Sequence, residues 1–221
     1  MVDIFDEISE DLRNERAVAL AKRYGALLII AMLAVLVGVG AQQYYASYQA
    51  RQAEKAATQY LAIASALDAP GAQPTTPQMT QAAQALTNFA ATAPEGYKTL
   101  ANLRAAGLYA TTGQKAQADA LWTGVAGDDH ADKLLRDLAT LLWAQHALGT
   151  APDAEVLAKL QPLVQASNPY HALARETQAL TFLHEGNEGM AKALFSQIAN
   201  DPNAPDGVRN RANGLLAQIN G

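Results

Sequence analysis

An apolar segment near the start of the chain limits what this sequence can fold into more than any other feature. The run "YGALLIIAMLAVLVGVGAQQYY" covers residues 24–45, and no charged side chain occurs between Arg23 and Arg51. Its 22 residues would form a helix of about 33 Å, against a bilayer hydrocarbon core of roughly 30 Å. We therefore predict a transmembrane helix whose membrane-interface residues are Arg23, Tyr24, Tyr44 and Tyr45.

The segment before this run favours a permanent anchor over a cleaved signal peptide. Val39 and Ala41 would fit a cleavage site, but the apolar run is longer than the signal-peptide core of about 7–15 residues. A leader of 23 residues precedes it, with six acidic and four basic residues. Signal peptides begin instead with a short basic stretch, so we expect the helix to be retained.

The distribution of Lys and Arg around the span predicts its orientation. Four basic residues precede the span and two follow it within a similar length: Arg13, Arg16, Lys22 and Arg23, then Arg51 and Lys55. Because loops rich in Lys and Arg stay in the cytoplasm, the N-terminus should be cytoplasmic. In a bacterium, the C-terminal part would then lie in the periplasm, anchored to the inner membrane.

The chain divides into five predicted parts. Residues 1–23 form a leader helix, with an apolar stripe of Ile4, Phe5, Ile8 and Leu12 that either lies at the membrane surface or docks on a partner. Residues 24–45 form the span, and 46–68 a helix that leaves the membrane. Residues 69–78 form a linker punctuated by proline and glycine, and 79–221 a folded domain.

Composition limits the class of that domain. The net charge of −5 disfavours a nucleic-acid partner, since phosphate binding needs a basic patch. The absence of cysteine excludes disulfides, thiolate metal sites and cysteine nucleophiles. Alanine is abundant and is the strongest helix former, which predicts an all-α domain.

Two windows in the domain share one pattern, "LRAAGLYATTGQKAQADALW" and "ETQALTFLHEGNEGMAKALF". Each has a glycine, with a small residue seven before it, an aromatic four before, alanine five after and an aromatic nine after. We interpret the ten positions as repeat-packing residues of helical hairpins: Ala106, Tyr109, Gly113, Ala118, Trp122, Ala179, Phe182, Gly186, Ala191 and Phe195. A third, poorly matched hairpin should turn at Gly149, and residues 205–221 should form a polar capping helix.

These offsets resemble the tetratricopeptide repeat, a unit in which small residues let two helices close and aromatics fill the space between hairpins. The predicted fold is therefore all-α: a single N-terminal transmembrane helix followed by a tetratricopeptide-like solenoid of helical hairpins.

The whole layout resembles the YfgM-like proteins of Gram-negative bacteria, and alphaproteobacterial members most closely. The similarity rests on "VDIFDEISEDLR", "YKTLANLRAAGLY" and "NPYHALARETQALTFLHEGNEGMAKALFSQ". Members of this family are ancillary subunits of the SecYEG translocon, with a domain related to that of CpoB. The resemblance implies an inner-membrane protein whose partners are the Sec translocon, periplasmic chaperones such as PpiD, and client chains.

The sequence holds no pattern that indicates catalysis. The histidines His130, His146, His171 and His184 have no metal-ligand spacing, and phosphate loops and nucleophile elbows are absent. The cluster "GDDHAD" at residues 127–132 is better explained by an acidic helix start than by a cation site. Trp122 and Trp143 could stack on a ligand, but their spacing favours a place in the core. We expect no catalytic, cofactor-binding or metal site.

We therefore expect a non-enzymatic scaffold that presents a concave helical face to protein segments. The alternative is a structural accessory subunit of an inner-membrane complex, for example a respiratory one.

Overall fold

The computed structural model is all-helical over the residues it describes. It describes the backbone of residues 4–69 and 71–220 and the side chains of residues 18, 22–25, 27, 29–69 and 71–219. The helices are α1 (Ile4–Asp68), α2 (Thr76–Ala90), α3 (Glu95–Thr111), α4 (Lys115–Ala126), α5 (Lys133–Ala147), α6 (Asp153–Leu160), α7 (His171–His184), α8 (Glu188–Ala199) and α9 (Asp206–Asn220). The side chains of the predicted leader stripe at Ile4, Phe5, Ile8 and Leu12 lie outside the described residues.

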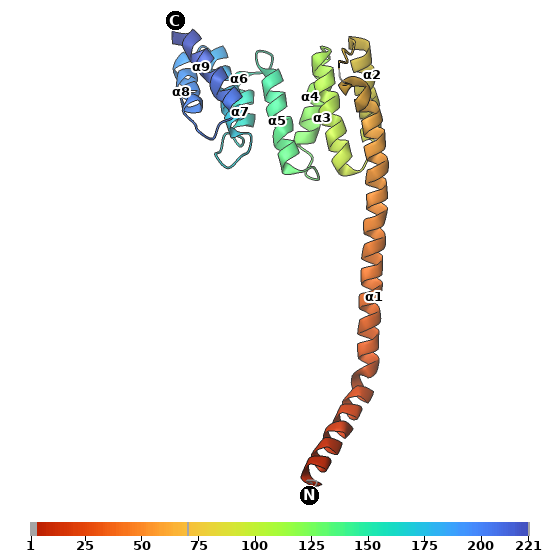
Figure 1. Cartoon of the computed structure of the whole chain (residues 1–221). Coiled ribbons are helices and arrows are strands. Elements are labelled where there is room, and N and C mark those ends of the chain that lie inside the picture. Colours follow the sequence, from red (N-terminus) through yellow and green to blue (C-terminus); the bar gives the residue numbers. More distant parts are fainter. Residues whose placement is uncertain (1–3, 70, 221) are drawn as a thin grey trace. The chain divides into compact units, whose positions relative to one another are not determined.

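The chain forms two compact units, Met1–Glu54 and Lys55–Gly221. The last part of α1, Lys55–Asp68, thus belongs with the C-terminal unit. Within that unit, α2 to α9 follow one another side by side in the order of the sequence (Figure 1). Each helix packs mainly against its neighbours along the chain, which is the arrangement of a solenoid.

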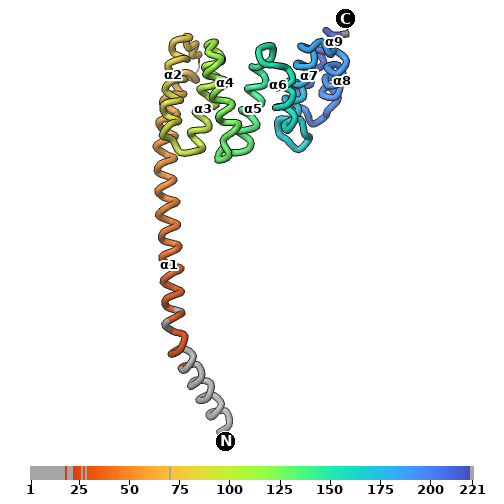
Figure 2. The backbone as a smooth tube through the Cα atoms, turned by 180° about the vertical axis from the view of Figure 1, so that it is seen from behind, coloured from red at the N-terminus to blue at the C-terminus, as the bar shows by residue number. Residues whose placement is uncertain are grey.

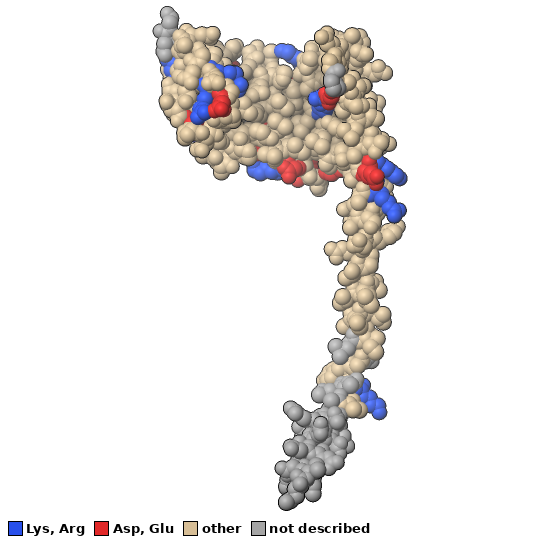
Figure 3. Space-filling view, in the orientation of Figure 1, with Lys and Arg blue, Asp and Glu red and all other residues tan. Residues whose placement is uncertain are grey.

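The apolar part of α1 is exposed along its length. The stretch Lys22–Asp68 contains an 18-residue window apolar enough to cross a membrane, and none of this window is buried. Figure 3 shows a length of α1 that carries no charged side chain on the face in view. A core helix of a soluble protein would bury such a surface, because exposed apolar area is unfavourable in water. This helix is therefore long and apolar enough to span a membrane.

Glycines in the left-handed region mark the turns between paired helices of the C-terminal unit. Gly71, Gly113, Gly149 and Gly186 have φ angles of 79°, 79°, 70° and 77°. They join the end of α1 to α2, α3 to α4, α5 to α6 and α7 to α8, so the unit contains successive helical hairpins (Figure 2). A side chain is strained at such φ values, which explains glycine at these four turns.

The two matched sequence windows form the same turn. The amide of Gln114 donates to the Tyr109 carbonyl over 2.8 Å, and that of Asn187 donates to the Phe182 carbonyl over 2.8 Å. In both cases the glycine amide also donates to the carbonyl three residues earlier, which completes a Schellman motif. The shared spacing of aromatic and glycine therefore corresponds to one helix-ending geometry used twice.

The third hairpin departs from its neighbours after α6. This helix has eight residues and ends at Leu160, shortly before Pro162, which cannot continue a helix. The segment from 161 to 170 follows without helical structure. Asn168 fixes it in place, because its side-chain nitrogen donates to Asp137 over 2.8 Å and its oxygen accepts from the Tyr170 amide over 2.9 Å.

The apolar core forms two clusters that meet at α7. The larger cluster runs from the end of α1 to α7, and the smaller is formed by α7, α8 and α9. Tyr60 near the end of α1 packs against the larger cluster. Its ring centroid lies 6.5 Å from that of Phe89 in α2 and 6.2 Å from that of Tyr97 in α3. Leu173 of α7 packs against both clusters.

An ion pair joins the final helix to α7. Arg211 of α9 donates from Nε and Nη2 to the two carboxylate oxygens of Glu176, over 2.6 and 2.7 Å. These hydrogen bonds raise the pKa of the Arg211 guanidinium above its usual value. The Glu176 side chain is only 7% exposed, so the pair satisfies a nearly buried carboxylate.

Candidate functional site

The ten repeat-packing positions lie in the interior or at hairpin turns. The four alanines are buried, as are Tyr109, Trp122 and Phe195, while Phe182 is half-buried. The two glycines hold the Schellman turns. A partner protein meets little of these side chains, so their role here is to hold the helices that carry the surface. The buried alanines are Ala106, Ala118, Ala179 and Ala191.

Trp122 connects successive hairpins. Its side chain is 1% exposed, and its ring stacks on that of His146 in α5, with centroids 4.8 Å apart and an angle of 26° between the planes. Its Nε1 has no hydrogen-bond partner among the described residues. Trp143 is also buried, under the ammonium of Lys159 at 4.6 Å from its ring centroid. Both tryptophans are core residues, and neither ring is open for stacking on a ligand.

The predicted membrane-interface residues are exposed on α1. Tyr24, Tyr44 and Tyr45 are 46%, 76% and 63% exposed. The Arg23 guanidinium lies 5.8 Å from the centroid of the Tyr24 ring. Exposed tyrosine and arginine next to an apolar surface suit the boundary between lipid headgroups and acyl chains.

The histidines are scattered and form no common site. His146 stacks on Trp122, and His171 Nδ1 lies 2.8 Å from the Asn168 carbonyl oxygen. His184 Nδ1 lies 2.9 Å from a carboxylate oxygen of Asp153 at the start of α6. Within the part of the chain that the structure describes, no three His, Asp or Glu side chains are grouped as metal ligands.

The acidic cluster at residues 127–132 helps to begin α5. The Asp132 carboxylate accepts a hydrogen bond of 2.8 Å from the Leu134 amide, as a helix N-cap does. Asp128 accepts one of 3.0 Å from the His130 amide and so fixes the preceding turn. These carboxylates thus bind backbone amides of their own segment.

The surface of the first hairpin contains a hollow region that the sequence reading did not single out. Two adjoining hollows share Leu67 and Pro74, and together we call them the N-terminal groove. The arginine hollow, of about 420 Å³, is lined by Leu67, Pro74, Met79, Leu103, Arg104, Gly107, Leu108 and Thr111. The alanine hollow, of about 360 Å³, is lined by Ala62, Ile63, Ala66, Leu67, Pro74, Gln78, Gln81, Ala82 and Ala85.

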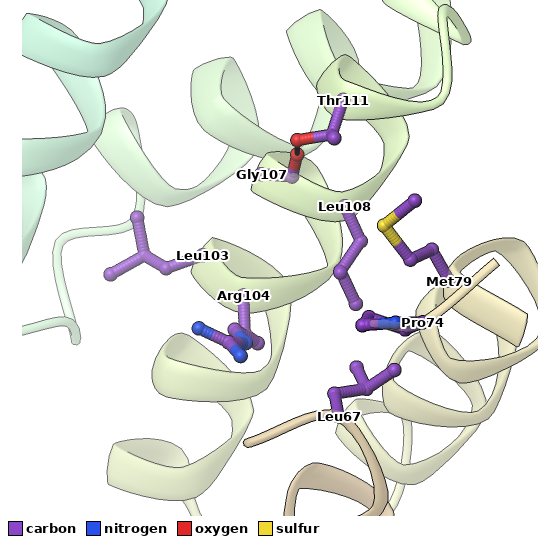
Figure 4. A pocket seen from close by; sticks show the side chains of 8 residues that line it. All are labelled: Leu67, Pro74, Met79, Leu103, Arg104, Gly107, Leu108 and Thr111. Atoms are coloured by element: carbon purple, nitrogen blue, oxygen red, sulfur yellow. Dashed lines mark hydrogen bonds between the residues drawn. The ribbon is translucent and has the colours of Figure 1, made fainter. Parts of the chain in front are cut away.

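Arg104 supplies the positive charge of this groove. Figure 4 shows Leu67, Pro74, Met79 and Leu108 gathered together, with Arg104 on the neighbouring turns of α3. The Nη2 of Arg104 donates to Asp68, the last residue of α1, and the two side chains are 40% and 57% exposed. The Nε of Arg104 is buried and has no hydrogen-bond partner among the described residues. The groove thus combines apolar walls with an incompletely paired guanidinium.

One sequence signal could have indicated this groove. Arg104 interrupts the run "LANLRAAGLY", in which every other residue except Asn102 is apolar or glycine. In a helix that packs against both neighbouring helices, a long charged side chain must extend to the protein surface so that its charged group stays in water. What the run cannot reveal is that the end of α1 and the start of α2 form the opposite walls.

Comparison with known proteins identifies the fold. A family model described as a tetratricopeptide repeat-like domain matches residues 20–210. The match begins within α1, so it includes the apolar helix as well as the hairpins. No curated protein and no solved structure gives a significant match. Because the family model covers well over half of the sequence, the chain belongs to the tetratricopeptide repeat-like domain family.

Proposed function

We propose that this protein is a membrane-anchored scaffold that binds other proteins through the surface of its helical hairpins. The observation that carries the proposal is the combination, in one chain, of a fully exposed membrane-length helix and a tetratricopeptide repeat-like unit. Repeat domains of this kind typically bind proteins and do not catalyse reactions.

The anchor is proposed to remain in the mature protein. The apolar run spans Tyr24–Tyr45, and α1 continues without a break from this run to Asp68. The length of the run matches the thickness of a bilayer, whereas the core of a signal peptide is shorter. Residues 1–23 would then remain in the cytoplasm, and the hairpins would lie on the opposite side of the membrane.

The charge bias and the resemblance to YfgM-like proteins support the proposed compartment and partners. Four Lys and Arg residues before the span and two after it support a cytoplasmic N-terminus and a periplasmic repeat unit at a bacterial inner membrane. In this proposal the unit assists the Sec translocon and periplasmic chaperones such as PpiD, with client chains as further partners. Tethering at the membrane raises the effective concentration of the repeats near emerging chains, so weak individual contacts suffice.

Affinity purification from membranes in mild detergent tests the proposal. We expect translocon and chaperone components to co-purify in sub-stoichiometric amounts, since a scaffold exchanges its partners. A structural accessory subunit would instead co-purify with one complex in a fixed ratio. Quantitative mass spectrometry distinguishes the two results, and a fixed ratio with a single complex would contradict the scaffold.

A matched variant makes this purification specific for the hairpins. A chain that keeps residues 1–54 but lacks Lys55–Gly221 should stay in the membrane and lose the partners. Partners that remain with the shortened chain would be bound by the span or the leader, and the repeats would then have no part in their capture.

A further inference from the structure

The N-terminal groove places one charged side chain beside apolar residues at the edge of the larger core cluster, to which Leu67, Leu103 and Leu108 belong. Among the residues that line the arginine hollow, Arg104 is the one charged side chain. Its neighbours in the hollow are aliphatic or are Pro74, Gly107 and Thr111. The Thr111 hydroxyl already donates to the Gly107 carbonyl over 2.9 Å, so it is satisfied within its own helix (Figure 4).

The hydrogen-bonding capacity of Arg104 is largely unused. A guanidinium has five N–H donors, and among the described residues the side chain of Arg104 makes one hydrogen bond, from Nη2 to Asp68. Its Nε is buried without a partner among the described residues. Buried donors in proteins are almost always paired with protein or water, so this N–H can donate to a further partner.

The present partner, Asp68, is weakly held. Both side chains of the pair are substantially exposed, and water and salt screen such a pair. Asp68 ends α1, directly before the segment with Gly71, so its position depends on a helix end. A carboxylate from outside could take its place on Arg104, because a bidentate arginine–carboxylate pair is among the strongest hydrogen-bonded contacts.

The two hollows supply room for apolar groups beside that carboxylate. Their volumes of about 420 and 360 Å³ are comparable to ligand pockets of roughly 300–1,000 Å³. In the alanine hollow, the short side chains of Ala62, Ala66, Ala82 and Ala85 leave space between α1 and α2. A small anion would leave the apolar side chains of the two hollows exposed to water, whereas a peptide with aliphatic side chains would cover them.

We propose that the N-terminal groove binds a segment of a protein partner in which a Glu or Asp carboxylate stands beside aliphatic side chains. The carboxylate pairs with Arg104 in place of Asp68, and the aliphatic groups enter the two hollows. The inference rests on the proposed function as a protein-binding scaffold and assigns one binding site to it. Asp68 then acts as an internal competitor that the partner displaces.

Peptide binding to the full chain tests this site. The protein is placed in phosphatidylcholine nanodiscs, whose neutral headgroups do not attract the peptides. The probe is a short fluorescent peptide of Leu, Ala and Ser with one central Glu and blocked ends, and its match has Gln in place of Glu. We expect fluorescence anisotropy to show the Glu peptide binding about tenfold more tightly than the Gln peptide.

Three variants assign the effect to the groove. Arg104→Gln should abolish the difference between the peptides, and Asp68→Asn should strengthen binding of the Glu peptide several-fold. Arg209→Gln, which removes a half-buried arginine paired with the exposed Asp206 in α9, should change neither the preference for the Glu peptide nor its affinity. Equal binding of the two peptides, binding of neither, or a preference that survives Arg104→Gln would overturn the proposal. Because Asp68→Asn changes an exposed side chain, it keeps the test decisive even where Arg104→Gln fails to fold.

A label reports where the peptide lies. The chain contains no cysteine, so Met79→Cys gives a single attachment point for an environment-sensitive dye in the arginine hollow. The Glu peptide should shift the emission of this dye and leave a dye at Met190→Cys on α8 unchanged.

An Arg104-dependent dimer seen by mass photometry without peptide would show that a second copy of the chain fills the groove, contrary to the proposal. Loss of peptide binding with normal capture of native partners would refute this site alone and leave the scaffold intact.

Discussion

Replacing Trp122 by alanine should lower the free energy of unfolding of the repeat unit by about 3–5 kcal/mol. The side chain is almost completely buried, and it stacks on His146 of the next hairpin. Removing it leaves a cavity between two hairpins, which the surrounding helices cannot close without shifting. Small domains have only about 5–15 kcal/mol of stability in total, so the loss is a large fraction of it.

The measurement is thermal unfolding by circular dichroism on the fragment from residue 46 onward, which contains the compact unit Lys55–Gly221. The midpoint of Trp122→Ala should fall by roughly 6–20 °C. Trp122→Phe should cost much less, because phenylalanine keeps an aromatic ring and removes the indole Nε1, which has no partner among the described residues. Ala106→Leu should overpack the α3 interface and cost about 1–3 kcal/mol. If Trp122→Ala and Ala106→Leu unfold like the parent, the assigned repeat packing is wrong.

Removing Arg211 should also destabilise the unit, because the nearly buried carboxylate of Glu176 would lose its positively charged partner. Breaking a buried ion pair by deleting one partner costs about 3–5 kcal/mol. Because Arg211 is 54% exposed, water reaches part of this pair, and we expect a loss of about 2–3 kcal/mol for Arg211→Met. The nearly buried Glu176 then has no cation, and α9 loses its polar link to α7. Urea unfolding of the same fragment measures the change.

Two further variants separate this ion pair from the general effects of charge. Arg209→Met, two residues earlier in α9, breaks a pair with Asp206, which is 84% exposed, and should change stability by less than about 0.5 kcal/mol. Adding Glu176→Leu to Arg211→Met should restore most of the loss, because an apolar pair needs no compensating charge. Equal losses for Arg209→Met and Arg211→Met would mean that the buried carboxylate is not the cause.

The helical hairpins were predictable where a local rule determines the turn. The spacing to Tyr109 and Phe182 identifies Gly113 and Gly186. The carbonyls of Tyr109 and Phe182 accept the Schellman hydrogen bond that spans five residues. A helix end of this kind depends on a few adjacent residues, so one sequence is enough to find it. The predicted all-α fold with one N-terminal membrane-length helix is also confirmed. This feature is predictable from one sequence because it depends on the length and composition of a segment.

Other features depend on contacts that a single sequence does not display. The pattern of residues 69–78 predicts a linker, but residues 71–75 form part of the loop of the first hairpin, with Gly71 at φ 79° and Thr75 beginning α2 in a capping box with Gln78. Its prolines resemble those of a linker, and only the packing of Tyr60 against α2 and α3 reveals the hairpin. The N-terminal groove was missed because its walls come from three helices and its single charge is on α3.

The most direct test of the account is the state of the apolar helix in the cell. Membranes from cells that express the full chain are washed with alkaline carbonate, and the protein is then analysed by intact mass spectrometry. A permanently anchored scaffold predicts that the protein stays in the membrane fraction at about the full 23.4 kDa, with residues 1–45 still attached. A soluble protein whose first residue is Gln42 would contradict it, because the repeats would then be free of the membrane.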